Sequence, residues 1–132
     1  MIRALLLVVF NLVLLVGVHA QAEIEEQEPW DKNYVDTAIL GSWKCEDAAM
    51  LKIIRTSRDY FLRPVITFKD REKYEVEREA HAWSWNFSQQ NQEVEIADME
   101  EMLLQRYKIK QLDERTLILM LGKQEIIFNK VQ

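Results

Sequence analysis

Apolar and polar residues alternate along much of the chain from about residue 63 to its end. In 73–79 the apolar Tyr74 and Val76 stand two positions apart, and charged residues occupy the positions around them. In 82–87 every second residue is aromatic. A period of two is typical of a strand with one buried face and one solvated face. The pattern therefore predicts an all-β fold of antiparallel strands.

Short polar turns join the predicted strands. Residues 98–105 are ambiguous, because Met99, Met102 and Leu103 also have helical spacing. We expect a turn at 98–101 and a strand after it. Only two glycines follow residue 20, so Asp, Asn and Lys are expected to form several of the turns. The predicted strands cover 43–45, 50–56, 63–69, 73–79, 82–87, 93–97, 103–112, 115–121 and 124–131.

A meander of this length buries its apolar face best by curling into a barrel, which also removes exposed strand edges. We therefore predict an antiparallel up-and-down barrel of about eight strands. A short helical turn at 34–40, with Asp36 near its start, is expected to precede the barrel.

The first 20 residues differ from the rest of the chain. One cation, Arg3, precedes an almost continuous apolar run, and Val18-His19-Ala20 fits a signal-peptidase site. The run is shorter than the roughly 20 residues of a membrane span. We predict a cleaved signal peptide at 1–20, with the cut after Ala20 or Ala22; an uncleaved signal anchor is the alternative. The protein is then secreted or periplasmic, with no stable membrane insertion after cleavage. Residues 21–36 are interpreted as an acidic flexible leader, and 37–132 as one barrel domain.

The charge of the chain excludes some classes of partner. The formal net charge is −5, and removal of residues 1–20 makes it more negative by one, because Arg3 is lost and no acid is. An acidic domain is a poor ligand for nucleic acid and for anionic membrane surfaces. The single cysteine, Cys45, cannot form an internal disulfide and is expected to be a small buried residue; an intermolecular disulfide is the alternative.

The tripeptide Gly41-Ser42-Trp43 opens the predicted barrel. Glycine lets the backbone bend or approach another element closely, and the indole two positions later lies on one face of the strand. This arrangement suits a strand that enters a barrel and closes its floor with a tryptophan. Further along, Phe68 precedes a turn and Tyr74, Trp85 precedes the Val94-Glu95-Ile96 strand, and three short apolar strands end the chain.

In this order and spacing, residues 37–131 resemble the lipocalin-like domains of small bacterial secreted and envelope proteins, relatives of the lipocalin and calycin barrels. The likeness rests on Gly41-Ser42-Trp43 and on 66–70 with Tyr74, although the usual turn glycine is absent there. The closing strands at 107–109, 117–119 and 128–130 complete it. The resemblance implies a cup for a small apolar ligand, no shared catalytic machinery, and a floor of Gly41 and Trp43. In lipocalins a basic residue of the last strand often covers the floor tryptophan, and Lys130 occupies that place.

Two hypotheses follow for the interior. Aromatic side chains on one strand face could line a cup and stack on a small hydrophobic or aromatic ligand. The same side chains could instead fill the core, because a barrel of about eight strands is only just wide enough for one small ligand. The protein would then be a structural or protein-interaction domain. The candidate ligand-binding residues are Phe68, Tyr74, Trp83, Trp85, Phe87 and Tyr107.

Catalytic and metal sites are not expected. His81 is the only histidine after residue 20, and a nucleophilic site would need a Ser or Cys beside it with an orienting acid. One histidine and one cysteine make a zinc site improbable. The acidic run at 72–79 places alternate members on a solvated strand face. We therefore predict a protein that is not an enzyme, with no cofactor and no metal; a small enzyme that uses His81 or a tyrosine is the weakest hypothesis.

Overall fold

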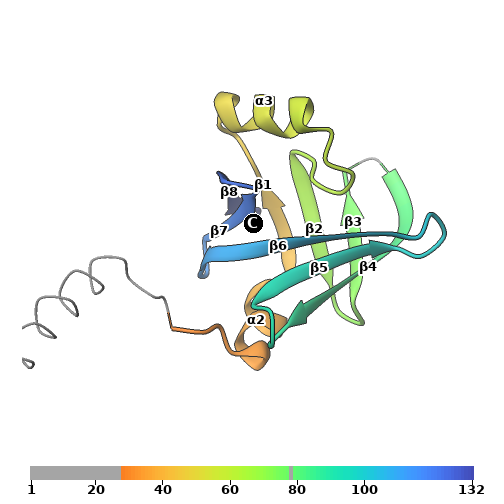
Figure 1. Ribbon diagram of the computed structural model, residues 1–132. Helices are drawn as coiled ribbons and strands as arrows, with labels where there is room; N and C mark the ends of the chain where they lie inside the picture. Colours follow the sequence, from red (N-terminus) through yellow and green to blue (C-terminus); the bar gives the residue numbers. More distant parts are fainter. Residues whose placement is uncertain (1–27, 78) are drawn as a thin grey trace, which may run out of the picture.

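The computed structural model describes residues 28–77 and 79–132, so the predicted signal peptide and residues 21–27 of the predicted leader lie outside the described residues. Its core is a closed barrel in which each strand pairs antiparallel with the next (Figure 1). The strand β8 closes the barrel on β1, where Trp43 pairs with Lys130 and Lys44 pairs with Asn129. The predicted all-β, eight-stranded antiparallel barrel is confirmed. The strands are β1 Gly41–Lys44, β2 Val65–Lys69, β3 Lys73–Val76, β4 Glu79–Ser88, β5 Glu93–Asp98, β6 Leu103–Leu112, β7 Thr116–Leu121 and β8 Gln124–Lys130.

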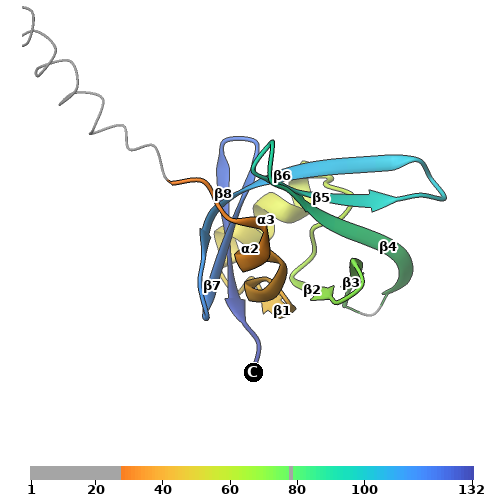
Figure 2. The ribbon, with the colours of Figure 1, turned by 90° about the horizontal axis from the view of Figure 1, so that it is seen from below.

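Two helices lie at opposite ends of the barrel. Helix α3, Ala48–Ser57, lies at one end in Figure 1, and α2, Lys32–Ala38, lies at the other. Seen from below, α2 is in front of the strands (Figure 2). Helix α2 contacts β4 and α3 contacts β8. Among the described residues, no helix has both the length and the apolar character needed to span a membrane.

The segment 50–56 was predicted as a strand, and this prediction is wrong because it forms most of α3. The side chain of Asp47 caps the helix by accepting a hydrogen bond from the backbone N–H of Met50 at 3.0 Å. Apolar residues at 50, 51, 53 and 54 place one face of the helix on the barrel, where Ile54 is buried. A helical period and a capping residue therefore outweigh the two adjacent β-branched isoleucines.

Helix α2 also differs from the expected turn. It begins at Lys32 rather than Tyr34, and its cap is Asp31, whose carboxylate accepts from the backbone N–H of Tyr34 at 3.3 Å. Contacts with the barrel begin before the helix, because the indole N–H of Trp30 donates to the carbonyl of Ile109 on β6 at 2.9 Å. Residues 30–36, which the sequence assigned to the leader, thus pack on the barrel.

The turns between strands contain the expected residue types, since Asp70, Asn91, Asp113 and Lys123 all lie in them. Asp98 and Asp113 do stabilise turns, because their carboxylates accept from backbone N–H groups two and three residues on. The left-handed positions, however, are not filled by Asn or Lys. Besides Gly122 in the β7–β8 turn, they are filled by Arg71, Glu72, Gln92 and Met102, all with φ near +60°.

Candidate functional site

The six predicted ligand-binding side chains all point into the barrel, and each is at most 5% exposed. Their rings pack on one another: Phe68 lies edge-on to Tyr74 and to Trp85, with centroids 5.2 and 5.5 Å apart. Phe61, from the connection between α3 and β2, adds an edge-on contact to Trp83 at 5.0 Å. These side chains form the core of the barrel. The six are Phe68, Tyr74, Trp83, Trp85, Phe87 and Tyr107.

The polar atoms of these rings are bonded within the protein. The hydroxyl of Tyr74 donates to the carbonyl of Phe61 at 2.9 Å, and the indole N–H of Trp85 donates to the carbonyl of Lys69 at 2.9 Å. Trp83 donates to Asp98 at 3.0 Å. A buried phenol or indole needs such a partner. An interior ligand would therefore have to replace bonds that the protein already makes.

The end of the barrel beneath α3 is closed by the connection 58–64. Phe61 and Leu62 are fully buried there. One oxygen of the Asp59 carboxylate accepts from the backbone N–H groups of Phe61 and Leu62, at 2.9 and 2.7 Å. The same carboxylate accepts the hydroxyl of Tyr107 at 2.8 Å. Asp59 thus fixes the connection in the mouth of the barrel.

The other end has the floor that the resemblance implied. Trp43 is fully buried, and its indole N–H donates to the carbonyl of Ile39 at 2.8 Å. The ammonium of Lys130 lies 4.5 Å from the centre of the Trp43 ring, a cation–π distance, and also donates to the carbonyl of Leu40. Desolvation lowers the pKa of Lys130 from its usual value. Gly41 lies beside this ammonium.

We predict that Gly41→Ala destabilises the fold by about 2 kcal/mol, because Gly41 has a φ of +118° that an L-residue with a side chain rarely adopts. An added methyl would also lie 2.5 Å from Nζ of Lys130 and displace it from Trp43. Urea denaturation followed by tryptophan fluorescence measures the loss. Gly122→Ala is the matched control: its φ of +61° is also positive, but open space surrounds the added methyl. Equal losses in the two variants would show that the Lys130 contact contributes nothing.

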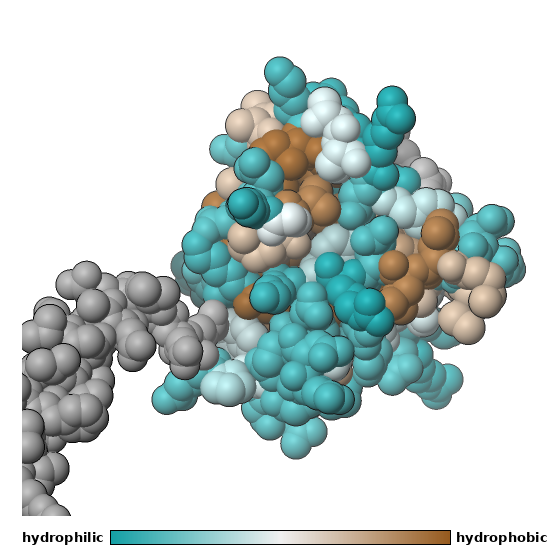
Figure 3. Space-filling view, viewed as in Figure 1, coloured by the Kyte–Doolittle hydropathy of each residue, from teal (hydrophilic) through white to brown (hydrophobic). Residues whose placement is uncertain are grey.

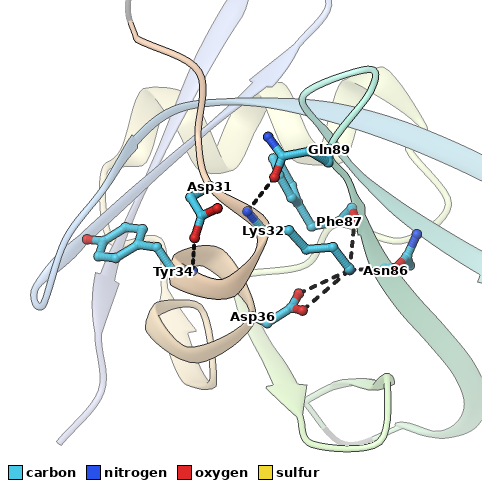
Figure 4. Close-up of polar contacts among 7 residues, drawn as sticks. All are labelled: Asp31, Lys32, Tyr34, Asp36, Asn86, Phe87 and Gln89. Atoms are coloured by element: carbon cyan, nitrogen blue, oxygen red, sulfur yellow. Dashed lines mark hydrogen bonds and ion pairs between the residues drawn. The ribbon is translucent and has the colours of Figure 1, made fainter.

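Helix α2 is fixed to β4 by polar contacts of Lys32 (Figure 4). Its ammonium donates to the side-chain oxygen of Asn86 and to the carbonyl of Phe87, both at 3.1 Å, and pairs with Asp36 at 3.4 Å. Its backbone N–H donates to the side chain of Gln89 at 2.6 Å. Beyond this helix, a groove of about 790 Å³ lies outside the barrel, between α2 and the turn that joins β6 to β7. Its walls are polar and apolar side chains, including Tyr34, Leu40 and Arg115.

Among the described residues, the two most exposed large apolar side chains lie at the tip of the β5–β6 hairpin, beside two half-exposed leucines. Met99 and Met102 are 70% and 83% exposed, and Leu103 and Leu104 are 40% and 44% exposed. The hairpin extends beyond the other strands in both ribbon views, and Figure 3 shows hydrophobic surface at its end. Exposed apolar clusters of this kind mark interaction sites. We call these four residues the hairpin tip.

A buried carboxylate holds the hairpin tip in place. Asp98, 6% exposed, accepts from the hydroxyl of Tyr60 at 2.8 Å and from the indole N–H of Trp83 at 3.0 Å. It also accepts from the backbone N–H groups of Glu100 and Glu101, at 3.0 and 3.2 Å. The hydrogen bond from Tyr60 and these further donors lower the pKa of Asp98. The apolar tip is therefore part of a fixed turn that the core supports.

The two remaining candidate residues, His81 and Cys45, have surroundings that fit structural roles. The ring of His81 stacks on Trp83, with centroids 4.1 Å apart. Cys45 is buried and is a free thiol, and burial raises its pKa. Within residues 28–77 and 79–132, no group of three or more His, Cys, Asp or Glu side chains could hold a metal ion.

No family model, no curated protein and no solved structure matches this chain. The fold is compatible with a calycin-like barrel.

The sequence analysis did not identify Asp59, which fixes the connection 58–64 in the barrel mouth. It also did not identify Asp98, which holds the hairpin tip. It also assigned no role to the hairpin tip. One local pattern could have found the tip, since turns are typically polar and this one carries Met99 and Met102 beside two leucines.

Proposed function

We propose that this protein is an exported lipocalin-like barrel that binds a protein partner through its hairpin tip and carries no small ligand in its interior. The exposed apolar tip, held by the buried Asp98, is the observation that supports this most directly. Export rests on the composition of residues 1–20. The role is one of binding without catalysis.

The packing of the interior favours this proposal over an interior ligand. A binding cup needs unfilled volume of a few hundred Å³ or more and free polar groups to orient the ligand. Here the rings contact one another, and their polar atoms are bonded to the protein. Phe61 and Leu62 occupy the mouth.

The charges beside the hairpin tip and the pairing of strand β6 indicate which kind of partner would fit. Glu100 and Glu101 lie between the two methionines, so a partner with an apolar cleft and a basic rim fits better than an anionic membrane. Residues 103–108 of β6 pair with β5, whereas the pairing of β6 with β7 spans 109–112. Among the described strands, the first half of β6 thus has one free edge. An extended segment of the partner can pair with this edge while its side chains cover Leu103 and Leu104.

We predict that the double substitution Met99→Gln and Met102→Gln weakens partner binding at least about tenfold, since it removes the two most exposed apolar side chains from the interface core. A photoreactive group at position 104 of the exported protein would crosslink the partner, which mass spectrometry identifies. Val131→Gln is the control, because it removes an apolar side chain that is 44% exposed on another part of the surface.

Three outcomes would count against the proposal. The crosslinked product could be equal in the tip variant and the control. The wild-type protein could float with lipid vesicles in a manner that depends on Met99 and Met102, which would make the partner a membrane. A lipophile could quench the tryptophan fluorescence saturably at one equivalent, which would restore the interior ligand.

A further inference from the structure

A second surface has the opposite charge from the rest of the molecule. A groove of about 390 Å³ lies between the end of α3 and the connection 58–64. We propose that it binds the acidic leader of a second copy of this chain, with residues 23–26, Glu-Ile-Glu-Glu, as the docking segment. This inference does not depend on the hairpin tip.

Three arginines give the groove its charge. Arg55 and Arg58 lie on α3 and at its end, and neither makes an ion pair with any residue of the described chain. Arg63 lies across the groove, and one nitrogen of its guanidinium donates to the carbonyls of Asp59 and Leu62, at 3.1 and 2.8 Å. The guanidinium has five N–H donors, so the remaining ones can bind a carboxylate.

One acid lines the groove, but its carboxylate is already bonded. Asp59 accepts the Tyr107 hydroxyl and the two backbone N–H groups inside the barrel mouth. Four further side chains, Ile54, Tyr60, Leu62 and Pro64, are apolar or aromatic. The groove therefore suits a segment with several carboxylates around one apolar side chain.

The leader has this composition. Glu23, Glu25 and Glu26 surround Ile24. With Ile24 placed on the apolar side chains of the groove, carboxylate–guanidinium pairs would form on both sides of it. Arg55 alone could be explained by its favourable place at a helix C-terminus. That explanation does not cover Arg63, which lies outside the helix.

The leader that fills the groove has to come from another copy. The described chain starts at Glu28 and leads into α2, whereas α3 lies at the other end of the barrel (Figure 1). The groove is lined by the end of α3 and by the connection after it. Five extended residues span at most about 18 Å. The ten-residue strands β4 and β6 are each roughly 33 Å long. β4 forms the wall on which α2 packs, and at a tilt of about 40° it rises about 25 Å, which is more than a leader that starts at α2 can span.

Sedimentation velocity of the exported protein over a range of concentrations tests this. We expect reversible self-association that weakens with added salt, as exposed ion pairs do. The pair Arg55→Glu and Arg58→Glu should weaken it at least about tenfold, and adding Glu25→Arg and Glu26→Arg to the same chain should restore most of the loss. Lys52→Glu with Lys123→Glu is the matched control, since it makes the same charge change outside the groove.

Circular dichroism checks that the groove variants fold. If they do not, Glu25→Gln with Glu26→Gln tests the same contact from the leader side, with the groove left intact. A chain that stays monomeric at every concentration overturns the inference. So does an association that Lys52→Glu with Lys123→Glu weakens equally, or one that the reversed charges fail to restore.

Discussion

Asp59→Ala is expected to lower the free energy of unfolding by about 3 kcal/mol. The substitution leaves the buried hydroxyl of Tyr107 and the backbone N–H groups of Phe61 and Leu62 without their acceptor. A buried donor that loses its partner costs about 1–3 kcal/mol, and water can reach some of these groups once the connection loosens. Urea denaturation followed by tryptophan fluorescence measures the change.

Two variants separate the anchoring role of Asp59 from a general effect of charge. Tyr107→Phe should cost only about 1 kcal/mol, because Asp59 keeps its two backbone donors and a single hydrogen bond is lost. Asp70→Ala, which removes an exposed carboxylate from the turn after β2, should change stability by less than about 0.5 kcal/mol. If Asp59→Ala costs no more than Asp70→Ala, the connection 58–64 is held by Phe61 and Leu62 alone.

The barrel could be predicted from the sequence because strand alternation is a local property. The period of two placed Tyr74 on one face of its strand, and Trp83, Trp85 and Phe87 together on one face of the next strand. All four side chains point inward. The same reasoning could not decide whether the interior holds a ligand. That depends on Phe61 and Leu62, which enter the mouth from a connection rather than from a strand.

The errors also have physical causes. In 50–56 the β-branched Ile53 and Ile54 favoured a strand, yet the helical spacing and the Asp47 cap were both present in the sequence. The roles of Asp59 and Asp98 could not be read in this way. Their partners Tyr107 and Tyr60 lie 48 and 38 residues away, and only the closed barrel brings them together.

Buried tyrosines make the protein sensitive to alkali. Burial raises the pKa of Tyr74 well above its usual value, and burial together with the charge of Asp59 raises the pKa of Tyr107. The folded state therefore keeps two phenolic protons that the unfolded state loses above about pH 10. The stabilisation that these two protonated phenols contribute is fully present below about pH 10. It is lost as the pH rises further, by about 1.4 kcal/mol per pH unit for each tyrosine.

We predict that Tyr107→Phe removes about 1.4 kcal/mol per pH unit from this alkaline loss, even though the variant is less stable near neutral pH. Tyr74, and Tyr60 whose pKa the hydrogen bond to Asp98 raises, still contribute in the variant. Urea denaturation at several pH values above 9 gives the slope for each protein. Lysines also titrate in this range, but they are the same in both proteins, so the difference isolates Tyr107. An unchanged slope in Tyr107→Phe would mean that the connection 58–64 opens before the global unfolding, and lets the Tyr107 hydroxyl reach solvent while the barrel remains folded.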